Sequence, residues 1–131
     1  MRVFLSALIL IAVSTIAQAD TIRRTIPANK TSTVGAHATY GPFCKAGAIP
    51  KMKVTKEPEH GTVSFRQVSY KLSEGAGRCA GQQVKGTAVI YKPKRGYRGK
   101  DVFKVGFTMD MYTAGSGKIR NVVDKYLIEV K

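Results

Sequence analysis

The residues from Val102 to Met109 alternate between apolar and polar side chains, with Phe103, Val105 and Phe107 on the apolar side. Successive side chains of an extended chain point to opposite faces of a sheet, so a repeat of two predicts a β-strand with one face on a core. The apolar face of this strand is continuous and ends with Met109. We therefore expect the strand to lie at the centre of the core.

The rest of the chain has little helical periodicity and several more short runs that read as strands. Turn signals rich in Gly and Pro separate them at 58–61, 75–77, 93–96 and 115–117. About seven short strands in roughly 110 residues favour an all-β, two-sheet antiparallel sandwich, with a small β-barrel as the alternative. The other expected strands cover residues 21–26, 30–34, 51–56, 62–69, 88–92 and 125–130.

The first 19 residues have the three parts of a secretory signal peptide. A short basic start precedes an apolar run, which closes on a small-x-small cleavage site. The run over 3–17 is shorter than the roughly 20 residues that a membrane-spanning helix needs. We expect residues 1–19 to be removed as a signal peptide. Residues 20–131 then form a single domain, periplasmic or secreted, with no transmembrane segment.

The chain is strongly basic, with 22 Lys and Arg against 8 Asp and Glu and a formal charge of +14, which falls to +13 when Arg2 leaves with the signal peptide. Such a charge attracts polyanions, although salt screens it within about 8 Å. The expected partner is an anionic glycan, lipopolysaccharide or another anionic envelope surface. Export makes nucleic acid a poor physiological partner. The alternative is a solvated basic surface that keeps an exported protein soluble.

Two cysteines, Cys44 and Cys79, remain in the exported chain. An even count in an oxidising compartment most often means a disulfide. Closing a loop of about 35 residues removes denatured-state entropy worth roughly 4 kcal/mol. We therefore expect these two cysteines to be bonded to each other.

Two segments resemble the bacterial immunoglobulin-like and cadherin-like repeat modules. Residues 56–63 carry a Pro-x-x-Gly-x-Val turn, and residues 89–103 carry Tyr-x-Pro followed by Gly-Tyr-x-Gly-x-Asp-x-Phe. The resemblance covers roughly residues 50–131. It implies an immunoglobulin-like sandwich and an adhesive or binding function, with no chemistry. Calcium binding between repeats is not expected, because this chain carries a single copy.

In the segment 89–103, Pro93 and Asp101 are expected to have structural roles. Pro93 ends a strand because it cannot donate to a ladder. Asp101 can accept backbone N–H bonds in a turn before Phe103 enters the core. We therefore expect Asp101 to be structural rather than catalytic.

The segment 91–100 holds five cations and two tyrosines. Arg and Lys bind phosphate, sulfate or carboxylate groups, and tyrosine rings stack on sugars. Tyr91 is assigned to the core, and the alternative for the cations is ordinary solvation. The candidate residues for an anionic ligand are Lys92, Lys94, Arg95, Tyr97, Arg98 and Lys100.

No catalytic or metal motif survives inspection. The segment 115–118 lacks the other residues of a phosphate-binding loop, and no Gly-x-Ser-x-Gly elbow is present. The spacing of the two histidines and two cysteines, from His37 to Cys79, lacks the short ligand pairs of structural zinc sites. We expect no enzyme activity, no cofactor and no metal.

The leading hypothesis is therefore a non-enzymatic exported binding module that docks an anionic glycan through basic loops. A second is a structural periplasmic protein that its charge holds at the envelope. A third is a small exported hydrolase or enzyme inhibitor. The sequence does not determine the oligomeric state.

The mature chain is expected to begin at Asp20, because Ala17 and Ala19 supply the small residues that signal peptidase requires. N-terminal sequencing of the exported protein measures this directly. An intact Met1 in the soluble fraction would show that the prediction is wrong.

Overall fold

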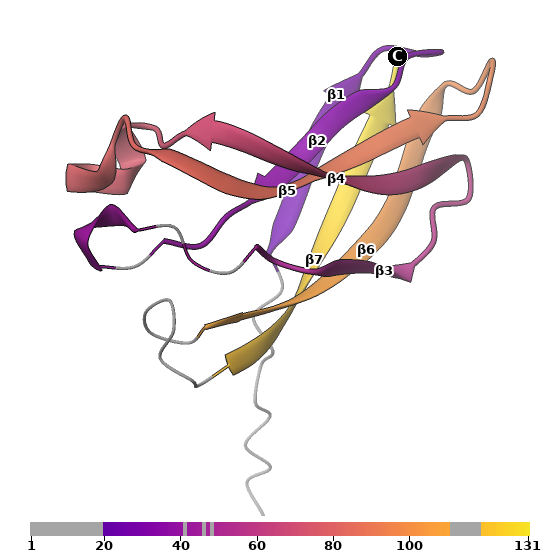
Figure 1. The fold of residues 1–131 in the computed structure, drawn as a ribbon. Coiled ribbons are helices and arrows are strands. Elements are labelled where there is room, and N and C mark those ends of the chain that lie inside the picture. Colours follow the sequence, from indigo (N-terminus) through magenta and orange to yellow (C-terminus); the bar gives the residue numbers. More distant parts are fainter. Residues whose placement is uncertain (1–19, 41, 46, 48, 111–118) are drawn as a thin grey trace, which may run out of the picture.

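The computed structural model describes residues 20–40, 42–45, 47, 49–110 and 119–131, which form two β-sheets packed face to face (Figure 1). One sheet has four strands in the order β1-β7-β6-β3, and the other has three in the order β2-β5-β4. The predicted all-β sandwich of about seven strands is confirmed, and the two separate sheets rule out the barrel alternative. The strands are β1 (Thr21–Ile26), β2 (Ser32–His37), β3 (Met52–Lys56), β4 (Gly61–Lys71), β5 (Gln83–Pro93), β6 (Gly99–Asp110) and β7 (Ile119–Val130).

Strands β2 to β7 have the sheet order B-E-D and C-F-G of an immunoglobulin-type sandwich. The first strand departs from the predicted antiparallel arrangement, because β1 runs parallel to β7 with Thr21 opposite Lys125. Consecutive strands β1 and β2 lie in different sheets, so they do not form a hairpin. Strand β1 instead completes the edge of the four-stranded sheet beside the last strand.

Two strands begin at least five residues earlier than the sequence indicates. Strand β5 starts at Gln83 rather than near residue 88, and β7 starts at Ile119 rather than near residue 125. In β7 the usual pattern is reversed, since Val123 is 36% exposed and Asp124 is 1% exposed. A strand that buries an acid and exposes a valine does not show the apolar alternation on which the prediction relied.

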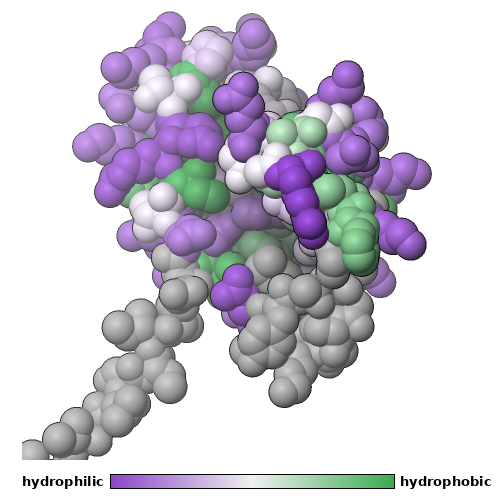
Figure 2. Space-filling view, turned by 90° about the vertical axis from the view of Figure 1, so that its left-hand side faces the viewer, coloured by the Kyte–Doolittle hydropathy of each residue, from purple (hydrophilic) through white to green (hydrophobic). Residues whose placement is uncertain are grey.

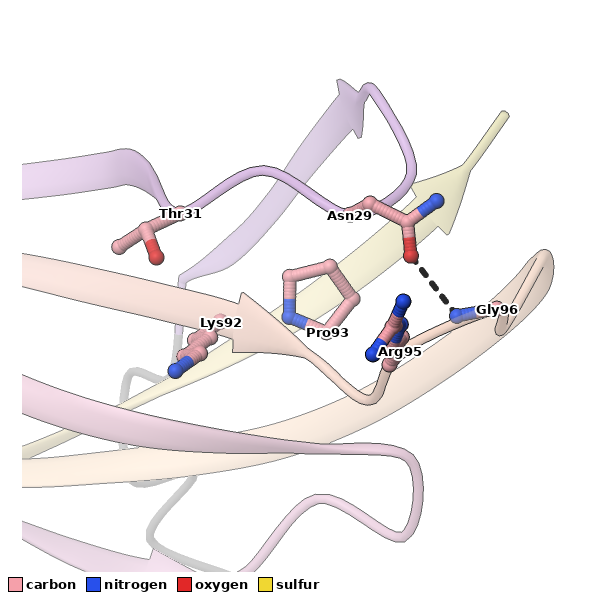
Figure 3. A pocket seen from close by; sticks show the side chains of 6 residues that line it. All are labelled: Asn29, Thr31, Lys92, Pro93, Arg95 and Gly96. Carbon is pink, nitrogen blue, oxygen red and sulfur yellow. Dashed lines mark hydrogen bonds between the residues drawn. The ribbon is translucent and has the colours of Figure 1, made fainter.

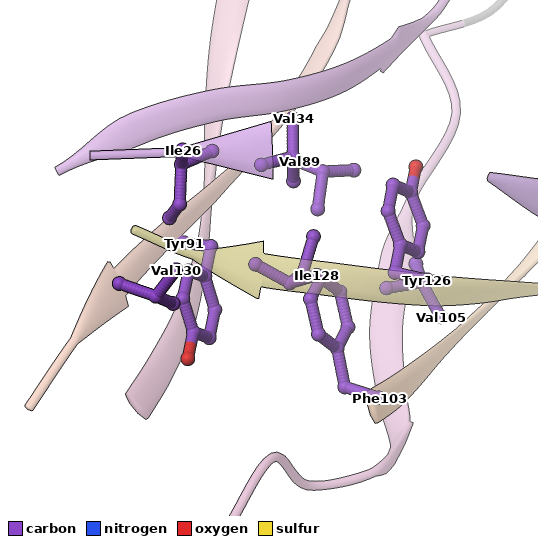
Figure 4. Packing of buried hydrophobic residues seen from close by; sticks show 9 residues of the cluster. All are labelled: Ile26, Val34, Val89, Tyr91, Phe103, Val105, Tyr126, Ile128 and Val130. Carbon is purple, nitrogen blue, oxygen red and sulfur yellow. The ribbon is translucent and has the colours of Figure 1, made fainter. Parts of the chain in front are cut away.

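The core lies between the sheets and draws on both (Figure 4). Phe103 and Val105 are fully buried and Phe107 is nearly so, which confirms the predicted face of β6; the side chain of Met109 lies outside the described residues. The ring of Phe103 stacks on Tyr126 at a centroid distance of 4.7 Å and on Tyr91 at 5.8 Å. The three rings come from β5, β6 and β7 and join the two sheets.

The predicted disulfide is confirmed. Cys44 and Cys79 are bonded, with their Cα atoms 5.3 Å apart. They lie in two short 3-10 segments, η1 (Pro42–Cys44) and η2 (Glu74–Cys79). The bond therefore ties the β2–β3 connection to the β4–β5 connection (Figure 1).

The expected signal peptide over 1–19 and the glycine-rich loop over 115–118 lie outside the described residues. Within the part that is described, no helix is long and apolar enough to cross a membrane.

The substitution Phe103→Ala is expected to lower the free energy of unfolding by about 3 to 5 kcal/mol, because it removes the central ring of the stack and leaves a cavity. Urea denaturation measures the loss. The matched control is Val102→Ala, on the opposite face of the same strand, which should cost less than about 1 kcal/mol. Equal losses in the two variants would contradict the assigned faces of β6.

Candidate anion-binding site

Three connections meet at the end of the sandwich opposite the disulfide. They are the β1–β2 connection at 27–31, the β3–β4 turn at 57–60 and the β5–β6 turn at 94–98. The segment that the sequence singled out for an anionic ligand therefore lies at one end of the fold, as expected of a turn between core strands. The other two connections decide which of its side chains are free.

Asp101 fixes the β3–β4 turn. Its carboxylate accepts backbone N–H bonds from Glu59 at 3.1 Å and His60 at 3.0 Å, and the hydroxyl of Tyr91 donates to it at 2.7 Å. Asp101 is 4% exposed. Its predicted structural role in capping a turn is confirmed. The capped backbone nevertheless belongs mainly to a turn about 40 residues away, a long-range contact that only the fold reveals.

Tyr91 is fully buried, as its assignment to the core predicted. Burial and the neighbouring Asp101 raise the pKa of its hydroxyl well above the ordinary value. The group therefore stays protonated and keeps donating to the carboxylate. Beside it, a Cβ on Gly61 would come within 2.6 Å of the Lys92 carbonyl and of the Tyr91 ring. The glycine of the Pro-x-x-Gly turn is thus required by the close approach of the two strands.

Tyr97 is used mainly by the turn itself. Its ring stacks on His60 with centroids 4.0 Å apart and an interplanar angle of 5°, and its hydroxyl donates to the carbonyl of Lys100. One face of the ring is therefore covered by His60. Only the other face is left for a sugar, which weakens the predicted role of Tyr97 in stacking.

Lys94 also turns toward the β3–β4 connection. Its backbone N–H donates to the carbonyl of His60 at 2.8 Å, and its Nζ donates to the carbonyl of Glu59 at 3.0 Å. These bonds fasten one turn to the other. Lys94 thus helps to hold the two turns together, and its ammonium group is partly used in doing so.

Lys92 and Arg95 lie together on a surface pocket of about 630 Å³ (Figure 3). The two cations flank Pro93, and both are exposed. Across the pocket, the Oδ1 atom of Asn29 accepts a 2.8 Å bond from the backbone N–H of Gly96, which holds the β1–β2 connection against the turn. The described residues that line this pocket include no acid; they are Asn29, Thr31, Lys92, Pro93, Arg95 and Gly96.

The remaining two predicted residues lie elsewhere. Lys100 lines a second pocket, of about 320 Å³, on the four-stranded sheet together with Arg23 and Glu129. Arg98 is exposed and lines neither pocket. The structure therefore brings Lys92 and Arg95 together and separates them from Lys100.

Sequence reasoning missed the contribution of Asn29 and Thr31 to the pocket. Asn29 has a positive φ of 58°, a conformation that Asn tolerates in turns. The Pro-Ala-Asn sequence before Lys30 was a usable turn signal. Nothing in the sequence, however, indicated that this turn lies beside Gly96.

A second basic surface crosses the outer face of the four-stranded sheet. Lys56 is opposite Lys104, and Lys104 is opposite Lys125, on three neighbouring strands. Like charges in directly opposite positions destabilise a sheet. Within the described residues no carboxylate lies within ion-pair distance of these three side chains, which we call the lysine row.

Hydrophilic side chains cover much of the face of the molecule shown in Figure 2, where hydrophobic residues form a patch on the right and smaller groups elsewhere. Apart from Val123 on β7, the large hydrophobic side chains exposed in the described part of the chain belong to the β2–β3 connection, where Phe43 is 83% exposed.

The histidines and cysteines considered for zinc are used in other ways. The cysteines form the disulfide, His60 stacks on Tyr97, and Nε2 of His37 lies 3.0 Å from Oδ2 of Asp124. Among the residues that the structure describes, no three His, Cys, Asp or Glu side chains come together as metal ligands.

Comparisons of the chain with known protein families, with curated proteins and with solved structures find no match. The resemblance to bacterial immunoglobulin-like and cadherin-like modules therefore stays a prediction.

The substitution Asp101→Asn is expected to lower the free energy of unfolding by about 2 to 3 kcal/mol, because an amide loses one acceptor oxygen and the charge that strengthens these bonds. Glu129→Gln, on the neighbouring strand, removes the same charge from a half-buried position and should cost about 0.5 kcal/mol or less. Denaturant titration at one pH compares the two. A loss for Asp101→Asn no greater than the control would mean that the carboxylate does not hold the turn.

Proposed function

We propose that this chain is an exported, non-enzymatic binding module that docks an anionic glycan of the bacterial envelope or of another surface. The proposal rests on the pocket at the loop end, where Lys92 and Arg95 face the same space and the described lining residues include no acid. Its volume is within the range of pockets that bind small ligands.

The polar groups around the pocket suit a sugar that carries an acid or a phosphate. The guanidinium of Arg95 can bind a carboxylate or phosphate with two parallel hydrogen bonds, and Lys92 adds a mobile point charge. The hydroxyl of Thr31 can exchange hydrogen bonds with sugar hydroxyls. The pocket therefore combines charge recognition with neutral polar contacts.

The frame around the pocket is held before any ligand binds. The bond from Gly96 to Asn29 joins two connections, and Lys94 joins the same turn to Glu59. Asp101 fixes the turn that contains Glu59. Binding to a preformed site loses less conformational entropy, which favours affinity and selectivity.

Export is part of the proposal. It is supported by the signal-peptide pattern of residues 1–19 and by the disulfide, since disulfides persist mainly in oxidising compartments.

The lysine row favours a second candidate function, that of a structural periplasmic protein held at the anionic envelope by charge alone. The positive charges of the lysine row repel one another, because the residues lie opposite each other on neighbouring strands. Binding to a polyanionic surface would relieve that repulsion. Such attachment needs no pocket and no selectivity among anions.

The double variant Lys92→Ser, Arg95→Ser is expected to weaken binding to lipopolysaccharide by about tenfold or more, a loss of about 1.4 kcal/mol in binding free energy. The matched control is Lys104→Ser, Lys125→Ser, which removes the same charge from the lysine row and should weaken binding less than threefold. Titrations at low and at physiological salt, with a neutral glycan as the negative probe, compare the two pairs.

Equal losses in the two pairs would support attachment by net charge and reject the pocket. A steep dependence on salt with no preference among anionic glycans would lead to the same conclusion. No binding to any anionic probe would reject both functions.

A further inference from the structure

Asp124 is a buried carboxylate with incomplete partners. It is 1% exposed on β7, and Nε2 of His37 lies 3.0 Å from its Oδ2 atom. The two side chains are close enough for an ion pair. Even so, within the described residues neither oxygen of Asp124 has a well-directed hydrogen bond, and neither does the buried hydroxyl of Tyr126.

A carboxylate buried in this way is costly, because removing a charge from water is repaid only by good partners. Burial raises the pKa of Asp124 above its ordinary value, and the carboxylate of Asp20 raises it further. The imidazole of His37 and the main chain of Asp20 act in the opposite direction. Two carboxyl groups thus lie near one histidine, and no Lys or Arg of the described residues makes an ion pair with Asp124.

The sheet places the main chain of Asp20 beside this site. Strand β1 runs parallel to β7 with Thr21 opposite Lys125, and the N–H of Lys125 donates to the carbonyl of Asp20 at 2.8 Å. Asp20 therefore lies beside Asp124 across the two strands, and its backbone nitrogen favours the charged carboxylate. The peptide bond before Asp20 is also the predicted cleavage site of the signal peptide.

We propose that the buried carboxylate of Asp124 is the binding site for the α-ammonium group that cleavage creates on Asp20. Before cleavage the nitrogen of Asp20 is a neutral amide with one N–H. Hydrolysis of the Ala19–Asp20 bond turns it into an amine with an ordinary pKa of about 8, which is largely protonated at neutral pH. The processed chain thus gains a positive charge and additional N–H donors beside Asp124.

The other described groups around the site do not supply a permanent positive charge. His37 is a cation only when protonated, the pKa of Tyr126 is raised to about 12 so that its hydroxyl stays neutral, and the ring of Phe107 packs against His37. Arg24 lies close enough to lower the pKa of Tyr126, yet it is exposed and makes no ion pair with Asp124. The α-ammonium group of a processed Asp20 would be the permanent partner of the Asp124 carboxylate.

The inference depends on cleavage before Asp20 and is independent of glycan binding. The full chain is expressed with its own leader, and the exported protein is purified and its N-terminus sequenced. A second chain carries Gly-Ser inserted between Ala19 and Asp20, which leaves an amide at Asp20 after processing. Both are also made with Asp124→Asn, and the melting temperatures of the four proteins are compared.

The insertion is expected to lower the melting temperature by about 4 °C or more with Asp124 present. In the Asp124→Asn background the insertion should change the melting temperature by less than about 1 °C, because the carboxylate that would bind the ammonium group is absent. An equal effect of the insertion in both backgrounds, no effect in either, or a natural N-terminus other than Asp20 would overturn the proposal.

A chemical measurement covers the case in which Asp124→Asn does not fold. The rate at which a limiting acylating reagent modifies the α-amine is measured by mass spectrometry of the N-terminal peptide. The amine of the natural processed chain should react at least about threefold more slowly than the amine of the inserted chain, because the ion pair with Asp124 keeps it protonated. Equal rates would overturn the proposal, whatever the result for lipopolysaccharide binding.

Discussion

The carboxylate of Asp101 is the interaction on which the rest of this fold depends. It lies on β6 in the four-stranded sheet, receives the hydroxyl of Tyr91 from β5 in the other sheet, and accepts two N–H groups from the turn that connects β3 to β4. One side chain thereby joins both layers and a connection between them. The pocket lined by Lys92 and Arg95 keeps its shape because the strand end and the turns around it are held from within.

The fold contains a second buried acid, Asp124, whose carboxylate is stabilised in a different way. Asp101 accepts hydrogen bonds from four donors, all of them neutral, whereas Asp124 depends on His37 and on the main chain of Asp20. Neutral donors suit an acid whose role is fixed as soon as the chain folds. An acid that binds a newly formed α-ammonium group, as we propose for Asp124, would instead make the stability of the fold depend on cleavage of the leader.

Local patterns were enough to predict the strands with regular alternation, the core face of β6 and the disulfide. They failed where packing overrides polarity, as at Val123 and Asp124, and where pairing is long-range, as in the parallel contact between β1 and β7. The cations of the β5–β6 turn were recognised as a group. The sequence could not show which of these cations lie together on the pocket, because that depends on contacts of the β5–β6 turn with Glu59 and Asn29 in distant turns.

The pairing of β1 with β7 has a consequence for how the molecule reaches its folded state. The first strand of the four-stranded sheet gains its neighbour only from the last one, and Lys131 closes the arrangement by bonding to Ile26 and Ala28. Contacts between residues so distant in sequence slow folding. A chain that emerges N-terminus first, from the ribosome or through the proposed export, cannot close this sheet until β7 has followed, so the topology delays completion of the four-stranded sheet until nearly the whole domain is available.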